Sequence, residues 1–152
     1  MPITVIALSS LILILDQISK FYISSALSLG QSIPVIRDIF HISLVYNTGC
    51  AFGLFRNQKI FFILLSAAVV FYIIRDLFSH GSRYSLSRRV ALGLILGGAA
   101  GNFLDRLRSG YIIDFLDFRV WPVFNLADSA ITVGISLLIL EVLRNSMRRT
   151  TN

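Results

Sequence analysis

Carboxylate and amide side chains gather in one stretch of the sequence, between Gly97 and Thr132. The stretch contains Asp105, Asp114, Asp117 and Asp128, together with Asn102 and Asn125. The chain on both sides is apolar enough to lie in a lipid bilayer. A charged carboxylate at the centre of a membrane helix costs roughly 2.5–3.5 kcal/mol, so carboxylates at such positions indicate function. Two carboxylates at close range cannot both stay ionised, so one holds a proton while the other remains a base.

Asp114 and Asp128 are the best candidates for such a pair. Asp114 lies on a short extended segment, and Asp117, on the opposite side of that segment, is interpreted as a solvated loop residue. Asp128 lies in the first turn of a predicted helix, and a turn at Trp121-Pro122 would fold it towards Asp114. Two facing carboxylates can activate water for attack on an amide. A role at the helix dipole alone is the alternative for Asp128.

The composition is that of a membrane protein. Hydrophobic residues make up 55% of the 152 residues and charged residues 14%, whereas soluble domains carry about 25% charged residues. The net charge of +6 fits arginine clusters that set topology and meet anionic lipid, and no pattern indicates a nucleic-acid partner. The single cysteine, Cys50, and the separated histidines His41 and His80 have no metal-ligand spacing. We therefore expect no metal and no cofactor.

Four apolar runs predict a membrane all-α fold with four transmembrane helices in a single domain, residues 1–152. The predicted spans cover approximately residues 3–26, 58–78, 88–105 and 125–143. The outer loops then cover approximately residues 27–57 and 106–124. In the third span, Gly93, Gly97 and Gly101 recur at every fourth position, which predicts a stripe along which helices approach closely. Asn125 is expected to cap the fourth span.

The first outer loop has the pattern of a β-strand. Apolar residues alternate with polar ones, in the order Phe40, His41, Ile42, Ser43, Leu44, Val45, Tyr46 and Asn47. Asn47-Thr48-Gly49 then predicts a turn. A polar, strand-forming segment cannot lie in hydrocarbon with unpaired edges. We therefore expect a small extracytoplasmic β-sheet in this loop, lying on the membrane surface.

Two further polar groups lie where spans meet the outer face. Asp16 and Lys20 are four residues apart on the first helix and can pair. This pair is either a boundary ion pair with Lys20 reaching to the interface or part of the site. Asn102, Asp105 and Arg106 share one face at the end of the third helix.

Four spans place both termini on one side of the membrane. The arginines of that side form compact clusters: Arg75, Arg83, Arg88 and Arg89, then Arg144, Arg148 and Arg149. The raw counts of Lys and Arg tie between the two sides, but Lys20 and Arg106 belong to polar motifs. We therefore expect both termini in the cytoplasm and the polar motifs at the outer face.

Five motifs resemble those of the lipoprotein signal peptidases, the signal peptidase II family of bacterial intramembrane aspartyl peptidases, and the resemblance covers nearly the whole chain. The motifs are Asp16-Gln17-Ile18-Ser19-Lys20, Asn47-Thr48-Gly49-Cys50-Ala51-Phe52-Gly53, the run from Gly97 to Arg106, Tyr111-Ile112-Ile113-Asp114-Phe115, and Phe124-Asn125-Leu126-Ala127-Asp128-Ser129-Ala130. Each motif alone is a weak signal. Their order and their common placement at the outer face make the signal strong.

The resemblance implies a role for each group of residues. Asp114 and Asp128 would be the catalytic dyad. Asn47, Asn102, Arg106 and Asn125 would line the substrate site, while Asp16, Lys20 and Asp105 would support it structurally. The implied substrate is a prolipoprotein whose cysteine carries a diacylglyceryl group, cut just before that cysteine, and the outer sheet would be the cradle for its mature side. We expect a monomer in the bacterial inner membrane, with these precursors and membrane lipids as its partners.

Two departures from the family pattern and two alternatives complete the interpretation. Cys50 replaces a small residue such as Ala, with little expected effect on packing. The segment between Asp114 and Asp128 is short for the family, which bears on the shape of the loop over the site. The main alternative is a transporter or proton-relay component with buried carboxylates. The other is a non-catalytic chaperone or lipid-binding bundle, for which Asp114→Asn would leave function intact.

Overall fold

The computed structural model describes residues 3–49 and 59–150, and in these ranges it has four long helices and one three-stranded sheet. The helices are α1 (Ile3–Ala26), α2 (Lys59–His80), α3 (Leu86–Arg108) and α4 (Leu126–Thr150), with a short 3-10 turn, η2 (Gly81–Arg83), between α2 and α3. All four long helices are long and apolar enough to cross a membrane. The prediction of four apolar spans with a small sheet is confirmed.

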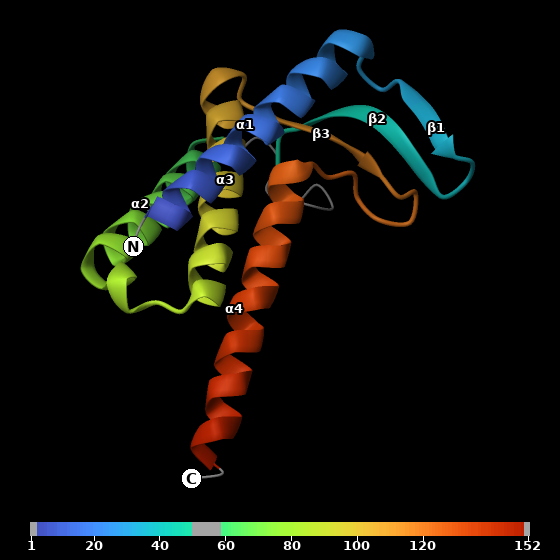
Figure 1. Cartoon of the computed structure of the whole chain (residues 1–152). Coiled ribbons are helices and arrows are strands. Elements are labelled where there is room, and N and C mark those ends of the chain that lie inside the picture. Colours follow the sequence, from blue (N-terminus) through green and yellow to red (C-terminus); the bar gives the residue numbers. More distant parts are fainter. Residues whose placement is uncertain (1–2, 50–58, 151–152) are drawn as a thin grey trace.

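Helix α3 is the centre of the bundle. It packs against α1, α2 and α4, and 61% of its most apolar window is buried, compared with 17% for each of the other three helices. Figure 1 shows α4 running along α3, with α1 crossing on the other side. The helix that is least apolar of the four is therefore the one most shielded from lipid, and it is the one that presents Asn102, Asp105 and Arg106.

The glycine stripe of α3 lets α1 come close, as the spacing predicts. A Cβ on Gly97 would lie 2.6 Å from the backbone oxygen of Ser9, and a Cβ on Gly101 would lie 2.5 Å from Asp16 Oδ2. Real Cβ atoms do not approach other atoms so closely. Glycine at these positions brings the carboxylate of Asp16 directly against the α3 backbone.

The sheet combines both outer loops. Strands β1 (Ser32–Ile36), β2 (Phe40–Asn47) and β3 (Ile112–Asp117) form an antiparallel sheet in that order. The prediction placed the sheet in the first outer loop alone, and this is incomplete because β3 comes from the second. Strand β2 would otherwise leave one edge unpaired, and β3 supplies the missing partner with Val45 opposite Asp114. Phe124 pairs with Leu116 on the other side of β3.

The helix ends differ modestly from the predicted boundaries. Helix α3 continues to Arg108, so the second outer loop begins later than residue 106, and Gly110 with φ +83° follows the end of the helix. Helix α4 continues to Thr150, beyond the predicted end near residue 143, because arginine is a good helix former. The start of α1 and the end of α4 lie at the end of the bundle opposite the sheet (Figure 1).

Candidate active site

A cavity of about 660 Å³ opens between the sheet and the adjoining ends of α3 and α4. Its polar wall includes five residues that the sequence singled out, together with Ser129 and Thr132: Asn47, Asn102, Arg106, Asp114 and Asp128. The remaining wall is largely apolar and includes Phe118, Trp121, Val123, Phe124 and Val133. Polar groups that can act on a peptide therefore share one cavity with a surface that suits hydrocarbon.

Asp114 lies on β3 with only 1% of its surface exposed. Its Oδ2 accepts a hydrogen bond from Asn47 Nδ2 at 2.9 Å, and its Oδ1 accepts one from Asn125 Nδ2 at 2.7 Å. Burial, and secondly the charge of Asp128, raise the pKa of Asp114 to about 7, although the two amide hydrogen bonds oppose the shift. A carboxyl group in this state can hold or release a proton near neutral pH.

Asp128 is built into the start of α4 by a capping box. Asn125 is the residue before the helix, and its Oδ1 accepts from the backbone N–H of Asp128 at 2.9 Å. In return, Asp128 Oδ2 accepts from the backbone N–H of Asn125 at 3.3 Å. The other oxygen, Oδ1, accepts from Asn102 Nδ2 at 2.8 Å. The predicted cap at Asn125 is confirmed, and Asp128 interacts with the helix start while also lining the cavity.

Asn125 joins the two aspartates. It is fully buried, and its side chain contacts Asp114 through Nδ2 while its backbone and side chain hold Asp128. The turn between Asp114 and Asp128 therefore brings them to one site, as the sequence predicted. Asp128 contacts the start of α4 and also lines the cavity beside Asp114, so its place is not explained by the helix start alone.

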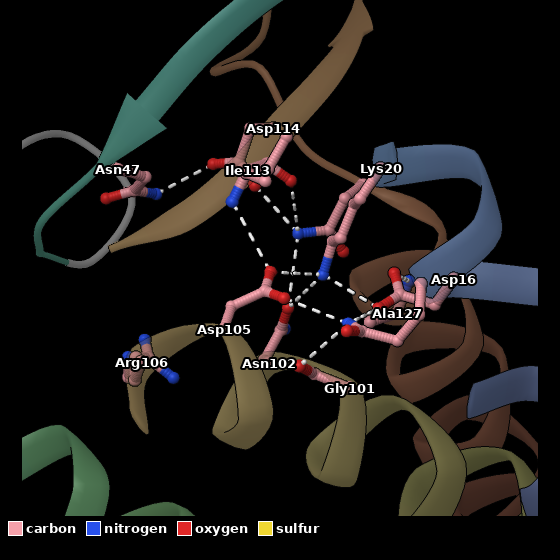
Figure 2. A network of polar contacts seen from close by, with 12 residues as sticks. Asp16, Lys20, Asn47, Gly101, Asn102, Asp105, Arg106, Ile113, Asp114 and Ala127 are labelled. Atoms are coloured by element: carbon pink, nitrogen blue, oxygen red, sulfur yellow. Dashed lines mark hydrogen bonds and ion pairs between the residues drawn. The ribbon is translucent and has the colours of Figure 1, made fainter. Parts of the chain in front are cut away.

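Asp16, Lys20 and Asp105 form a buried charged cluster next to the two aspartates (Figure 2). Lys20 Nζ lies 2.8 Å from Asp16 Oδ2, 2.7 Å from Asp105 Oδ2 and 3.1 Å from Asn102 Oδ1. Asp16 Oδ1 accepts from the backbone N–H of Ala127 at 3.0 Å. Only 2% of Lys20 is exposed. The alternative in which Lys20 reaches out to the interface is therefore wrong.

The turn after β2 orients Asn47. The backbone N–H of Gly49 donates to Asn47 Oδ1 at 3.0 Å, which is the side-chain turn expected of Asn-Thr-Gly. Because Oδ1 is engaged in this way, the Nδ2 group faces Asp114. Cys50 and the remainder of its motif lie outside the described residues.

Asp117 is not solvated, contrary to the interpretation from sequence. It is 6% exposed, and it accepts hydrogen bonds from Ser43 Oγ at 2.8 Å and from Arg119. Burial alone would raise the pKa of Asp117, but the bonds from Ser43 and Arg119 together hold the pKa below its usual 3.8. Asp117 does not line the cavity, and it joins β3 to β2. The alternation along the strand could not reveal this partner.

Two sets of supporting residues had no role assigned from the sequence. Gln17 Nε2 donates to Asp105 Oδ1 at 2.9 Å, and Arg108 donates to Gln17 Oε1 at 3.1 Å, so Gln17 links α1 to α3. On α2, Ser66 accepts from Arg106 at 3.3 Å, and the ring of Phe62 lies 4.9 Å from the Arg106 guanidinium carbon. Ser66 is a polar residue inside an apolar span, and this feature of the sequence could have indicated a polar partner on another helix.

The comparisons with known proteins agree with this geometry. A family model described as signal peptidase (SPase) II matches residues 8–144. The chain belongs to the signal peptidase II family. It is therefore an aspartic-type peptidase, a multi-pass bacterial membrane protein that removes signal peptides from prolipoproteins. This membership decides against the transporter and the non-catalytic bundle.

Individual relatives are similar over almost their full length. The lipoprotein signal peptidase of Brevibacillus brevis is 44% identical over 137 residues, covering 89% of this chain and 91% of that protein. The lipoprotein signal peptidase of Bacillus subtilis is 39% identical over 146 residues, covering 91% and 92%. A solved structure described as a bacterial membrane enzyme is 31% identical, with a TM-score of 0.87, covering 94% of this chain and 89% of that one.

Proposed function

We propose that Asp114 and Asp128 are the catalytic dyad, and that they activate water to cut a prolipoprotein just before its diacylglyceryl-modified cysteine. The observation that carries this proposal is the single cavity that both carboxylates line, with Asn125 bonded to each. Among residues 3–49 and 59–150, no group of three or more His, Cys, Asp or Glu is arranged to hold a metal ion.

The reaction that fits this arrangement is direct hydrolysis. One carboxylate removes a proton from water as the water oxygen attacks the peptide carbonyl carbon, and the other donates its proton to the carbonyl oxygen. The tetrahedral intermediate then breaks its C–N bond, the leaving amine takes the proton from the first carboxylate, and the second recovers its proton from the new carboxyl group. Each cycle therefore restores the dyad.

The walls of the cavity support a lipidated substrate. Phe118, Trp121 and Val133 offer hydrocarbon contacts beside Asp114 and Asp128, and each CH₂ kept from water contributes roughly 0.8 kcal/mol. Asn47, Asn102 and Arg106 line the cavity and are proposed to bind the peptide backbone around the cut. Asn125 is fully buried, and we propose that it holds the two aspartates in place. Asp16, Lys20 and Asp105 are proposed to support the site from α1 and α3.

The proposed orientation places both termini in the cytoplasm and the site at the outer face of a monomer in the inner membrane. The sheet and the cavity lie at one end of the helices. Arg83 lies in η2 between α2 and α3, and Arg88 and Arg89 lie in the first turn of α3. An excess of compact arginine clusters marks the cytoplasmic side of a membrane protein. A peptidase that acts on exported precursors needs its site on the other side.

The dyad is tested with purified protein in lipid and a diacylglyceryl-modified precursor, with products identified by mass. Asp114→Asn and Asp128→Asn should each lower cleavage by roughly 10²–10⁴-fold, because an amide keeps the shape but cannot exchange the proton. Asp117→Asn is the matched control: it changes a buried aspartate of the same strand that does not line the cavity. Near-normal cleavage by either dyad variant would overturn the assignment.

The same assay tests the substrate. An unlipidated precursor of the same peptide sequence should be cleaved far more slowly in the same membranes, because it lacks the chains that hold it at the apolar wall. The mass of the mature product should show a lipidated cysteine at its amino terminus. Equal rates for the two precursors would contradict the proposed substrate but would leave the dyad in place.

A further inference from the structure

The side-chain amide of Asn102 has only one orientation that satisfies its neighbours. Lys20 carries three N–H donors and no acceptor, and its three partners are Asp16, Asp105 and Asn102 Oδ1. Only the amide oxygen can face the ammonium group, and this oxygen also accepts from Asn125 Nδ2 at 3.2 Å. The NH₂ group of Asn102 must therefore point the other way, at Asp128 Oδ1, 2.8 Å away.

The side-chain amide of Asn125 is also oriented by its neighbours. Its Oδ1 faces the backbone N–H of Asp128, which is a donor and nothing else. Its Nδ2 therefore faces Asp114 Oδ1, at 2.7 Å. Both amides next to the dyad have a fixed direction. The direction of Asn102 is set by the ammonium group of Lys20, which pairs with Asp16 and Asp105 and bonds to Asn102.

The two aspartates stand in unequal surroundings. Asp128 accepts from a backbone N–H and from Asn102, and it lies in the first turn of α4, where the helix dipole favours negative charge. Asp114 lies on a strand and is almost completely buried, and the donors to it among the described residues are the neutral side-chain amides of Asn47 and Asn125. The cost of burial and the charge of Asp128 favour the protonated form of Asp114, whose pKa is raised to about 7.

We propose that Lys20 is a positioning residue: it orients Asn102 so that Asp128 stays ionised as the base, while Asp114 keeps the proton and acts as the acid. This inference rests on the proposed dyad. Asp128 then takes the proton from water and later gives it to the leaving amine. Asp114 gives its proton to the carbonyl oxygen and recovers it when the intermediate breaks down.

Charged groups from two helices lie near the dyad and can influence its pH dependence. Asp16 and Lys20 approach from α1, and Asp105 approaches from α3. Arg106, also from α3, lines the cavity. The formal charges of the cluster of Asp16, Lys20 and Asp105 sum to −1, so removing Lys20 alone also leaves two buried carboxylates without their cation.

The test uses the full-length enzyme in lipid and the diacylglyceryl-modified precursor. Lys20→Met should lower kcat by about 10- to 100-fold, the loss expected for one charge-assisted hydrogen bond. The acid limit of the kcat/KM profile should move to higher pH, because the carboxylate of Asp128 loses the oriented N–H donor that stabilises its charge. The alkaline limit should also rise, since the Lys20 charge opposes the pKa shift of Asp114.

A double-mutant cycle with Asn102→Ala separates positioning from structural support. Because Lys20 acts through Asn102, Lys20→Met should cost less than 3-fold further in kcat once Asn102 is Ala, which is our threshold for non-additivity. The proposal would be overturned if the fold-losses in kcat of the two single variants multiplied in the double variant and if Lys20→Met left both pH limits unchanged. Asp114→Asn and Asp128→Asn serve as the reference. If both are inactive, the proposed dyad is supported whatever the result for Lys20.

Two further variants keep the test decisive. Gln17→Leu removes another α1–α3 link to Asp105 but leaves the Lys20–Asn102 contact. It should lower the melting temperature without moving either pH limit. If Lys20→Met does not fold, the double variant Asp16→Asn/Lys20→Met takes its place, because it restores the cluster charge of −1. The acid limit of its kcat/KM profile should lie at higher pH than that of Asp16→Asn. An unchanged acid limit in this pair would overturn the proposal.

Discussion

At the residue scale, three asparagine side chains and one backbone N–H donate to the two aspartates of the proposed dyad. Asn47 and Asn125 each donate to Asp114, and Asn102 and the backbone of Asn125 donate to Asp128. The number of donors is similar for the two aspartates. The difference between them therefore comes from burial and from the helix start, and it supports the proposal that Asp114 is the acid, because burial raises its pKa to about 7.

The pH dependence follows from this assignment. Asp114 must carry a proton to act, so kcat/KM of the wild-type enzyme should fall as the pH rises through about 7. The bond from Asn47 stabilises the ionised form of Asp114 and lowers its pKa. Asn47→Ala should therefore raise the pKa of Asp114 further and move the alkaline limit to higher pH, as measured in profiles of kcat/KM.

Tyr46→Phe is the control for Asn47→Ala. It changes the neighbouring residue of β2, which stacks on Tyr111 at 4.1 Å between ring centroids, whereas the bond to Asp114 comes from Asn47. Its pH limits should match those of the wild type. If Asn47→Ala also kept the wild-type alkaline limit, Asp114 would not be the group that loses its proton there.

At the element scale, the approach of α1 to α3 brings Asp16 and Lys20 to the site. This approach depends on Gly97, where a Cβ would meet the backbone of Ser9, which cannot rotate away. At Gly93 the nearest atoms belong to the flexible side chain of Leu8, at 3.1 Å. The two glycines of one stripe therefore differ in what surrounds them.

Gly97→Ala should destabilise the protein by about 1–3 kcal/mol, because the helices must separate or the backbone must shift. Gly93→Ala should be much closer to neutral, since the gain in helix propensity of roughly 1 kcal/mol offsets a small displacement of Leu8. Thermal unfolding in detergent compares the two variants. Equal losses at Gly93 and Gly97 would mean that close helix contact at Gly97 is not what limits substitution.

At the scale of the whole molecule, the site lies at the end of the bundle opposite the start of α1 and the end of α4 (Figure 1). Strands β2 and β3 and helices α3 and α4 all contribute to the cavity. A cytoplasmic position for the termini therefore requires an outer position for the dyad, so one measurement of topology tests both statements.

Cysteine labelling measures this topology. In a Cys50→Ala background, Arg37→Cys places a thiol at the turn between β1 and β2, where the native side chain is 93% exposed. A thiol reagent that cannot cross membranes should label it in intact spheroplasts. Ser82→Cys, in η2 between α2 and α3, should be labelled only after the membrane is broken. The reverse pattern would place the dyad in the cytoplasm and contradict the proposed orientation.

The amino-acid sequence was enough to predict the spans, the polar motifs and the two aspartates. These features depend on local patterns: runs of apolar residues long enough for a bilayer, a glycine at every fourth position, and an Asn three residues before an Asp at a helix start. Each pattern extends over a single helix or turn, so it can be detected without knowing what lies beside it. The family resemblance then joined the separate motifs into one site.

The tertiary structure decided which distant residues meet. Lys20 and Asn102 are 82 positions apart, and Asp16 and Ala127 are 111 apart, so no local period reveals that Lys20 points inward rather than to the interface. Strand β3 joins the sheet, and Ser43 buries Asp117, for the same reason. Hydrogen-bond partners across helices depend on packing distance and direction, which only the folded chain fixes.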